Sequence, residues 1–252
     1  MKLDRRNQII DMINAQRTVK NSELMERFDI SIETVRRDLE ALEQQGYLRR
    51  VYGGAVRGTS LSSEPEYDSR SKARSKEKLA IAAAAAKLVE PRDSVYLGVG
   101  TTVQGMAQHL KRIDGLTVFT NALRTAVELS EAPECTVILS GGRLRAKELT
   151  LSGFPAEENF EQFNVDKAFI GIGGISDAGV TDFHVDEARL HRQLIKNARQ
   201  AIVLADSEKL GLRAVVNVCP LTEIHTVITD SGAPRQMVKL LEQAGIRVIL
   251  AK

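Results

Sequence analysis

A charged helix followed at once by a basic strand and a glycine turn is the feature that most limits what this chain can form. The helix is expected over residues 31–42, where Val35, Leu39 and Leu42 recur at helical spacing and so line one face. The strand and turn follow in residues 46–54, which read Gly-Tyr-Leu-Arg-Arg-Val-Tyr-Gly-Gly. A helix with one apolar and one polar face beside such a hairpin predicts a small winged module that reads DNA.

Two further helices are expected upstream of this segment. The apolar side chains that mark the first are Ile9, Ile10 and Ile13. The second carries Leu24 and Phe28 one turn apart, and we expect Asn21 or Ser22 to be its N-cap. Ser31 is the expected N-cap of the third helix. Two helices joined by a tight turn, with the second entering the major groove through its N-terminal residues, form a helix-turn-helix.

The expected DNA contacts lie on the first turns of the third helix and on the strand. They are Ser31, Thr34, Arg36, Arg37, Arg49 and Arg50. Side chains at the start of a recognition helix reach base edges and flanking phosphates, and arginines on the strand would reach phosphates beside the groove. Charge alone does not decide the matter, because residues 1–57 hold 11 Lys or Arg against 9 Asp or Glu. The alternative is a small helical subdomain with a solvated charged face.

The same residues resemble a known family. The run S-x-x-T-V-R-R-D-L over residues 31–39, with R-x-x-G-G-A over residues 50–55, resembles the N-terminal signature of the DeoR-type bacterial repressors of sugar metabolism. The resemblance extends over nearly all 252 residues. It implies an N-terminal winged helix-turn-helix that binds double-stranded operator DNA. It also implies a C-terminal domain that senses a phosphorylated sugar or polyol.

Composition agrees with a soluble protein that has an ample core. Of the 252 residues, 43% are hydrophobic and 27% are charged, and no apolar run approaches the roughly 20 residues that span a bilayer. The start of the chain lacks the apolar segment of a signal peptide, so a cytoplasmic location is expected. Cys135 and Cys219 support neither a disulfide framework nor a tetrahedral metal site. We therefore expect no metal and no cofactor.

The chain is expected to hold two domains of an α/β protein. Residues 1–57 would form the winged helix-turn-helix, residues 58–75 a linker, and residues 76–252 the effector domain. In the last part, apolar runs of strand length occur at residues 94–99, 116–120, 135–140, 167–172, 200–205, 226–229 and 247–250. Segments of helical pattern alternate with them at residues 82–86, 103–110, 122–130, 187–198 and 235–244. This alternation predicts a mostly parallel sheet covered by helices, with ligands at the C-terminal ends of the strands.

The loops at these strand ends carry the residues expected to bind a ligand. The first loop, residues 98–102, reads Gly-Val-Gly-Thr-Thr and opens a helix, so its free amides and hydroxyls can hold an anion such as phosphate. It is not a dinucleotide fingerprint, because the third glycine would fall at Val103. The loops after four other strands are expected to share the pocket, although each could be a turn chosen for its backbone angles. They cover residues 120–122, 140–142, 171–174 and 205–211.

The expected effector-binding residues come from these loops and from one helix. They are Gly100, Thr101, Thr102, Asn121, Gly142, Glu187, Asp206 and Lys209. Lys209 could instead be an ordinary solvated cation, and Glu187 could instead pair with a basic residue of its own helix. Those basic residues are Arg189, Arg192 and Lys196. Asp182 and Asp186 could line the mouth of the pocket or cap the next helix, and the four histidines lack metal spacing.

The same loops resemble, more distantly, those of ribose-5-phosphate isomerases. In such enzymes a glycine-threonine loop holds the phosphate, a strand ends in Ala-Asp-x-x-Lys, and a glutamate on a following helix is the base. Residues 98–102, residues 205–209 and Glu187 stand in the matching places. The isomerases carry aspartates in the loop where this chain has glycines within residues 171–174. Enediol chemistry needs proton-shuttling partners besides a base, so we expect binding without catalysis and no catalytic residue.

The leading hypothesis is therefore a transcriptional repressor of a carbohydrate or polyol catabolic operon, released from its operator by a phosphorylated sugar or polyol. A sugar-phosphate isomerase with an accessory DNA-binding arm is the alternative, and a nucleotide-responsive regulator lacks any nucleotide motif. One small winged module contacts few phosphates, and operators are usually read by symmetric pairs. A homodimer or homotetramer is therefore expected.

Overall fold

The computed structural model describes residues 2–16, 18–44, 48–57, 64 and 66–252. The chain divides into two compact units, Met1–Glu64 and Pro65–Lys252. The first unit has one hydrophobic core, and the second has a core on each face of its main sheet. Within the described ranges, no helix is long and apolar enough to cross a membrane.

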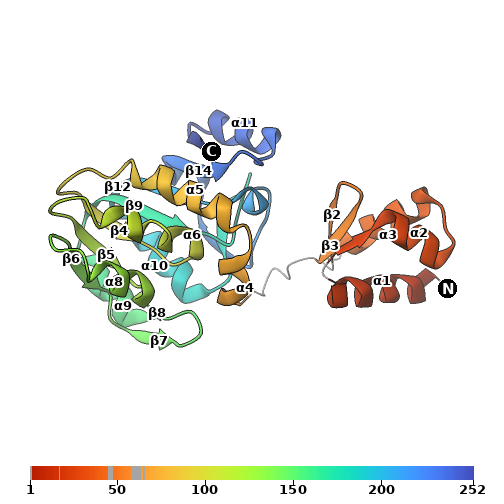
Figure 1. The fold of residues 1–252 in the computed structure, drawn as a ribbon, viewed down its shortest axis with the longest axis horizontal. Coiled ribbons are helices and arrows are strands. Elements are labelled where there is room, and N and C mark those ends of the chain that lie inside the picture. The colour runs from red at the N-terminus through yellow and green to blue at the C-terminus, as the bar shows by residue number, and fades with distance from the viewer. Residues whose placement is uncertain (1, 17, 45–47, 58–63, 65) are drawn as a thin grey trace. The chain divides into compact units, whose positions relative to one another are not determined.

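The first unit consists of three helices and a small antiparallel sheet (Figure 1). The helices are α1 (Lys2–Gln16), α2 (Asn21–Phe28) and α3 (Ile32–Gln44). The strands lie in the order β1 (Thr18–Lys20), β3 (Gly54–Arg57) and β2 (Leu48–Val51). The hairpin of β2 and β3 is the wing, so the predicted winged helix-turn-helix is confirmed.

The apolar face of α3 packs into the core of this unit, as its spacing predicts. Val35 and Leu39 are at most 1% exposed and pack with residues of α1 and α2. Asp38 also faces inward and accepts hydrogen bonds of 2.6 to 2.8 Å from Arg5 and Arg6 of α1. A buried carboxylate is costly unless it is paired, so these bonds make Asp38 compatible with the core. Charge as well as apolar contact therefore joins α1 to α3.

The starts of two helices test the capping predictions. Ser31 Oγ accepts a hydrogen bond of 3.4 Å from the amide of Thr34, so Ser31 is the N-cap of α3 as predicted. The prediction that Asn21 or its neighbour caps α2 is wrong, because α2 begins at Asn21 and its N-cap position is Lys20, which makes no side-chain capping bond. The amide of Asn21 donates instead to the carbonyl of Gly53 at 2.8 Å. A carbonyl of the wing turn thus provides the acceptor for the first backbone amide of α2.

The wing is fixed to β1 by a very close approach of two backbones. A Cβ atom built on Gly54 would lie 2.1 Å from the carbonyl oxygen of Val19. No side chain fits in that space, because the obstructing atom belongs to the backbone. Tyr52, at the tip of the hairpin, is by contrast fully exposed.

The second unit is built on a seven-stranded sheet in which every pairing is parallel. Its strands lie in the order β15 (Arg247–Ala251), β14 (Thr226–Asp230), β12 (Ala198–Leu204), β9 (Val165–Gly171), β4 (Ser94–Leu97), β5 (Thr117–Thr120) and β6 (Thr136–Leu139). All seven correspond to the apolar runs of the sequence. Because the pairings are parallel, the C-terminal ends of these strands share one edge of the sheet, where ligands bind in such folds.

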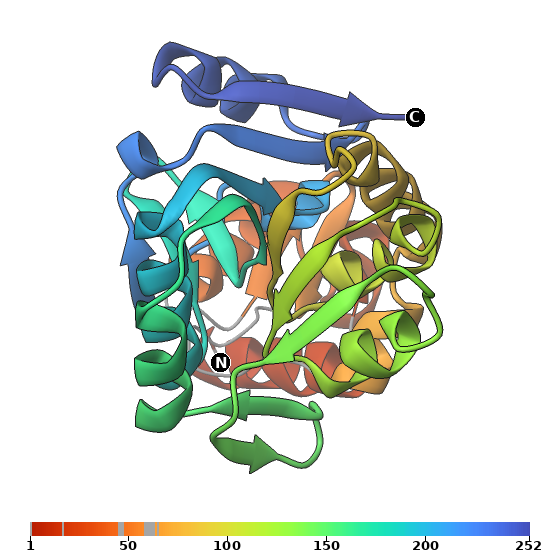
Figure 2. The same ribbon diagram turned by 90° about the vertical axis from the view of Figure 1, so that its left-hand side faces the viewer.

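Helices cover both faces of this sheet, and Figure 2 shows the two layers with the strands between them. One layer comprises α5 (Ser75–Ala86), α6 (Thr101–Gln104), α7 (Ala107–Leu110) and α8 (Leu123–Leu129). The other comprises α9 (Phe154–Glu161), α10 (Val185–Lys196) and α11 (Arg235–Gln243). Successive residues of β4 divide between them, since Val95 and Leu97 pack in the first layer and Tyr96 in the second. The predicted α/β class is confirmed.

Several elements differ from the sequence-based expectation. The helix expected over residues 103–110 is two short helices, α6 and α7, with Gly105 as the C-cap of α6. Helix α9 and five short strands were not expected. The strands are β7 (Arg143–Arg145), β8 (Thr150–Ser152), β10 (Gly174–Ser176), β11 (Gly179–Asp182) and β13 (Val216–Cys219). Two of them form the β7–β8 hairpin, and the other three form a small antiparallel sheet.

The second half of the expected linker belongs to the second unit. Residues 58–63 and 65 lie outside the described residues. Helix α4 (Tyr67–Lys72) follows, and Tyr67 donates a hydrogen bond to Gln104 of α6. Arg74 bonds Asp230 at 3.0 Å. The linker prediction is therefore wrong beyond residue 66, because polar side chains in this stretch make specific contacts with strand-end loops.

Candidate functional site

The start of α3 presents polar side chains away from the core. The hydroxyls of Ser31 and Thr34 lie 3.2 Å apart in the first turn. Arg36 and Arg37 are exposed and form no ion pair with any residue that the structure describes. Exposed guanidinium groups on the outer face of a recognition helix are available for base edges and phosphates. The structure thus brings together Ser31, Thr34, Arg36 and Arg37 on one helix start, and their DNA contacts stay a prediction.

The two arginines of the wing lie in different surroundings. Successive side chains of a strand point to opposite faces, so Arg49 and Arg50 cannot point the same way. Arg50 holds Glu43 of α3 at 2.8 Å, and its own amide donates to the same carboxylate at 2.7 Å. This hydrogen bond to Glu43 raises the pKa of Arg50. Because Arg50 is already paired with Glu43, it would attract a DNA phosphate less strongly than an unpaired arginine would.

In the second unit, the loops after the central strands β4 and β9 press together at the C-terminal edge. A Cβ atom on Gly171 would lie 2.4 Å from the carbonyl oxygen of Val99, so packing requires a glycine at this position. Gly100 precedes α6, with Thr101 partly exposed and Thr102 7% exposed. Because α6 has only four residues, the anion-binding potential of this loop rests on its amides and hydroxyls rather than on a long helix dipole.

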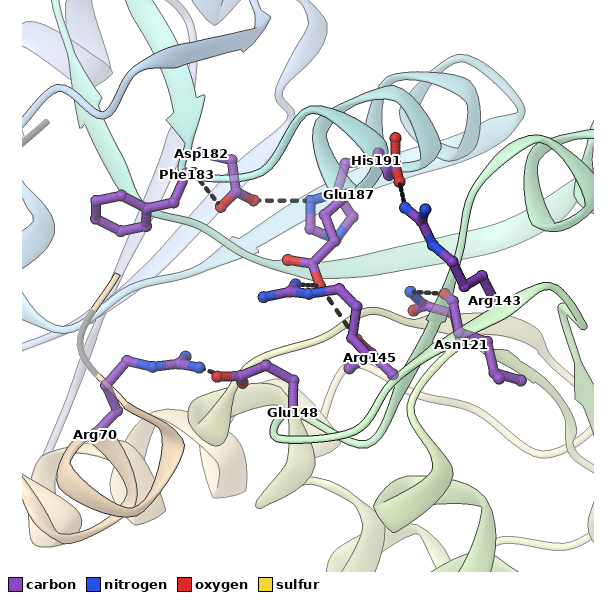
Figure 3. A network of polar contacts seen from close by, with 12 residues as sticks. Arg70, Asn121, Arg143, Arg145, Glu148, Asp182, Phe183, Glu187 and His191 are labelled. Carbon is purple, nitrogen blue, oxygen red and sulfur yellow. Dashed lines mark hydrogen bonds and ion pairs between the residues drawn. The ribbon is translucent and has the colours of Figure 1, made fainter. Parts of the chain in front are cut away.

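Glu187 is the centre of a polar network beside these loops (Figure 3). It lies in the first turn of α10, is 3% exposed, and accepts hydrogen bonds from Arg145 and from Thr150 Oγ1, the latter at 3.2 Å. Both partners belong to the β7–β8 hairpin. The alternative in which Glu187 pairs with its own helix is not what the structure shows, and Arg192 of that helix donates instead to the carbonyl of Val218 at 2.9 Å.

Asn121 and Gly142 each make contacts that support the fold at the same edge. Asn121 is fully buried, its Oδ1 accepts from the hydroxyl of Tyr96 at 2.8 Å, and its Nδ2 donates to the carbonyl of Leu151 at 3.0 Å. Burial and the nearby carboxylates raise the pKa of Tyr96 well above its ordinary value, so this hydroxyl stays a donor. A Cβ atom on Gly142 would lie 2.7 Å from the carbonyl oxygen of Ser152. Contact of either residue with a ligand stays a prediction.

The aspartates expected at the pocket mouth also have partners. Asp182 Oδ2 lies 3.3 Å from Nδ1 of the fully buried His191, and Asp186 pairs with Arg143 at 2.8 Å. Neither aspartate caps α10, whose N-cap is His184 without a side-chain capping bond. No group of three His, Cys, Asp or Glu side chains in the described part of the chain is arranged to hold a metal.

Asp206 and Lys209 lie in the segment that follows β12 at the same edge of the sheet. Asp206 is 5% exposed and accepts from the amide of Glu208 at 3.1 Å, so it caps the short helix η1 (Ser207–Lys209). Lys209 Nζ lies 5.6 Å from the ring centroid of Phe183, which follows β11. The loop after β12 is thereby joined to the segment that leads into α10.

Three basic residues at this edge were not predicted from the sequence: Arg70, Arg74 and Lys78. Arg74 bonds the hydroxyl of Ser207 and the carboxylate of Asp230, both at 3.0 Å. Burial alone would raise the pKa of Asp230, but hydrogen bonds from backbone amides and the Arg74 charge lower it. The three cations recur every fourth residue, a spacing that places them on one face of a helix. This spacing could have identified them, but the prediction of a linker over residues 58–75 left it unused.

Lys78 is the most informative of the three. It is half buried on α5 and donates to the backbone carbonyl of Arg70. Burial lowers its pKa, the cations Lys209 and Arg70 lower it further, and the carboxylates of Asp206 and Glu208 oppose the change. Arg70 of α4 and Lys209 of η1 therefore each lie within electrostatic range of Lys78 of α5, together with the carboxylates of Asp206 and Glu208.

Comparisons with known proteins agree with both halves of this description. Residues 5–60 match the DeoR-like helix-turn-helix domain, and residues 73–231 match the DeoR C-terminal sensor domain. The HTH-type transcriptional repressor GlcR of Bacillus subtilis (strain 168) is 34% identical over 244 residues, which cover 97% of this chain and 94% of that protein. The glycerol-3-phosphate regulon repressor of Escherichia coli (strain K12) is 32% identical over 247 residues, 98% of each chain.

Among solved structures, the second unit is similar to ribose 5-phosphate isomerase A from Methanocaldococcus jannaschii, with 17% identity, a TM-score of 0.41 and 55% of each chain covered. That likeness is too remote to bear on activity. The family matches, by contrast, are to transcriptional regulators rather than enzymes, so the isomerase alternative is set aside. The chain belongs to the DeoR family of transcriptional regulators, with an N-terminal helix-turn-helix domain that binds DNA and a C-terminal sensor domain.

Proposed function

We propose that this protein represses a carbohydrate or polyol catabolic operon and leaves its operator when a phosphorylated sugar or polyol binds at the C-terminal edge of the seven-stranded sheet. The observation that carries this proposal is a set of basic residues at this edge: Lys78 is half buried and donates to the carbonyl of Arg70, and α4, which carries Arg70, is bonded through Tyr67 to Gln104 of the helix that follows the 98–102 loop. Lys209 also lies within electrostatic range of Lys78. Like charges held together lower the pKa of a half-buried lysine, and a bound dianion relieves that repulsion. Backbone amides of the loop add donors of the kind that hold phosphate.

The relatives include one that is named for a phosphorylated polyol, which supports a phosphorylated effector. One relative is the glycerol-3-phosphate regulon repressor of Escherichia coli, and another is the putative aga operon transcriptional repressor of Escherichia coli O157:H7, 32% identical over 250 residues. A buried glutamate, Glu187, with arginine and threonine partners offers hydrogen-bond acceptors for sugar hydroxyls. The proposed effector site therefore includes Gly100, Thr101, Thr102, Asn121, Gly142, Glu187, Asp206 and Lys209, together with Arg70 and Lys78.

The test is operator binding titrated with a panel of phosphorylated sugars and polyols that has first been narrowed by thermal shift. Lys78→Gln should weaken release by the active metabolite roughly tenfold or more, because a hydrogen bond to a charged group is lost. Lys76→Gln is the matched control, since Lys76 is exposed on the same helix. If no phosphorylated metabolite releases the operator, or if both variants respond like the wild type, the proposal is wrong.

We further propose that the protein acts as a homodimer or homotetramer, because a single winged module covers too few phosphates for a specific operator. Sedimentation at operator-binding concentrations checks this directly. A monomer bound to a full operator would contradict it.

A further inference from the structure

Two arginine–carboxylate pairs lie at the edge of the sheet, and the β7–β8 hairpin contributes to both (Figure 3). Arg145 of β7 holds Glu187 of α10. Glu148, three residues further along the hairpin, holds Arg70 of α4. The Arg70 and Glu148 side chains are 15% and 13% exposed, so this pair is largely withdrawn from water. Side chains this withdrawn interact more strongly than an exposed surface pair does.

The Arg70–Glu148 pair lies beside a second cation, Lys78, which donates a hydrogen bond to the carbonyl of Arg70. Arg70 lies close enough to Lys78 to lower the pKa of that lysine, and Lys209 acts on Lys78 in the same way. Tyr67, one turn before Arg70 on α4, donates to Gln104 of α6, the helix that follows the 98–102 loop. Glu148 therefore places a negative charge on Arg70, whose helix is bonded to the helix that follows the loop proposed to hold phosphate.

A guanidinium group has one planar fork that binds carboxylate and phosphate in the same bidentate way. A phosphate group that approaches Arg70 meets this carboxylate as a rival for the same donors and as a like charge. The affinity measured for the phosphate is then the intrinsic affinity multiplied by the fraction of molecules in which Glu148 has given up the arginine.

Building on the proposed effector site, we propose that Glu148 is an intramolecular competitor for the phosphate group of the effector. Its carboxylate holds Arg70 until a phosphate displaces it, and it thereby sets the effector concentration at which the regulator responds. The Arg70–Glu148 pair also joins α4 to the β7–β8 hairpin. When phosphate displaces Glu148, this contact between α4 and the hairpin is lost.

The hairpin offers a matched control. Lys147, the neighbour of Glu148, pairs at 3.2 Å with Glu66, which precedes α4, and these side chains are 86% and 78% exposed. This exposed pair joins the same two segments as the Arg70–Glu148 pair. Glu66→Gln therefore removes the same charge from the same junction without freeing Arg70.

The experiment measures the apparent dissociation constant of inorganic phosphate for the full chain, from the phosphate dependence of the melting temperature at constant ionic strength. Glu148→Gln should bind phosphate roughly five- to tenfold tighter than wild type, because a competing charge is gone while the side-chain shape is kept. Glu66→Gln should match the wild type. In an Arg70→Gln background, Glu148→Gln should give no gain, since the contested group is absent.

Equal or weaker phosphate binding by Glu148→Gln, with the wild type still binding, would overturn the competitor role and leave the proposed function standing. Loss of phosphate binding in the wild type and in every variant would instead overturn the proposed effector site itself, and the competitor role with it. Should Glu148→Gln fail to fold, Glu148→Asp keeps the charge and shortens its reach. It should then give a smaller gain in the same direction, and a loss of affinity would contradict the proposal.

Discussion

The arginines of the two units are held in different ways. On α3, Arg36 and Arg37 are exposed and pair with no described residue, whereas Arg70 and Arg145 of the second unit each hold a carboxylate. Exposed, unpaired cations suit a partner that presents many phosphates and releases counterions as it binds. An arginine that is paired and partly buried can bind a single anion only when that anion displaces the carboxylate. The comparison teaches that the proposed functions assign one kind of side chain to two tasks, exposed on α3 for operator DNA and paired at the sheet edge for a single anion.

The largest effect is expected from breaking a pair at the sheet edge. Glu187→Ala removes a carboxylate that is 4% exposed and breaks its bonds with Arg145 and Thr150, so it should lower the free energy of unfolding of the second unit by about 2 to 4 kcal/mol. Urea unfolding followed by circular dichroism measures this. Asp186→Ala is the control, because the Arg143–Asp186 pair joins the same hairpin and helix with side chains 75% and 31% exposed. That change should cost about 0 to 1 kcal/mol, and equal losses would erase the distinction between buried and exposed pairs.

The next effect concerns the selective site and its ligand. Thr102→Ala removes a hydroxyl from the 98–102 loop and should weaken effector binding by about 1.5 to 3 kcal/mol, which is roughly 10- to 150-fold. Operator binding without effector should not change. Thr136→Ala, at the exposed start of β6, is the control. Release curves identical to those of the wild type would show that phosphate does not bind at this loop.

A somewhat smaller effect is expected on the broad surface. Arg36→Ala and Arg37→Ala should each cost about 1 to 3 kcal/mol of operator affinity where they contact bases. Where they contact phosphates, binding should weaken uniformly across sequences and the salt slope should flatten. Gel-shift titrations at two or more salt concentrations separate these cases, with Lys239→Ala on α11 as a control for net charge. Unchanged affinity in both arginine variants would remove α3 as the reading helix.

The smallest effect tests the paired arginine of the first unit. Arg50 and Glu43 have side chains 41% and 33% exposed, so Arg50→Ala should cost only about 0.2 to 1 kcal/mol of stability. Glu43→Gln should strengthen nonspecific DNA binding and steepen its salt dependence, because it frees the Arg50 charge. Fluorescence anisotropy with a random duplex measures this. No change in the salt slope would mean that Arg50 does not face DNA.

Most of the fold could be predicted from the sequence because burial leaves periodic traces. The seven central strands are apolar runs, and α3 shows its core face in the spacing of Val35, Leu39 and Leu42. The β7 strand left no such trace, because it has only three residues and its single apolar side chain, Leu144, is 48% exposed. Helix α4 was not predicted, because it consists mainly of serine and charged residues and makes polar rather than apolar contacts.

The site was predictable only in part, for a related reason. Loops that follow strands could be found by position, and Thr102, Asp206 and Lys209 do lie at the C-terminal edge of the sheet, although their contact with an effector stays a prediction. The Arg70–Glu148 pair could not be found in this way, because the two residues are 78 positions apart and nothing local links them. An ion pair between distant segments is a property of the packing, so it appears only when the fold is known.

The close approach at Gly54 divides the wing into a root and a tip with opposite tolerance for change. At the root, any substitution collides with the backbone of β1 and disturbs the sheet. At the tip, Tyr52 meets nothing that would resist replacement. We therefore expect this wing to accept new side chains at its tip without loss of the fold, and to accept none at Gly54. A change of operator preference through the wing would then have to come from the tip.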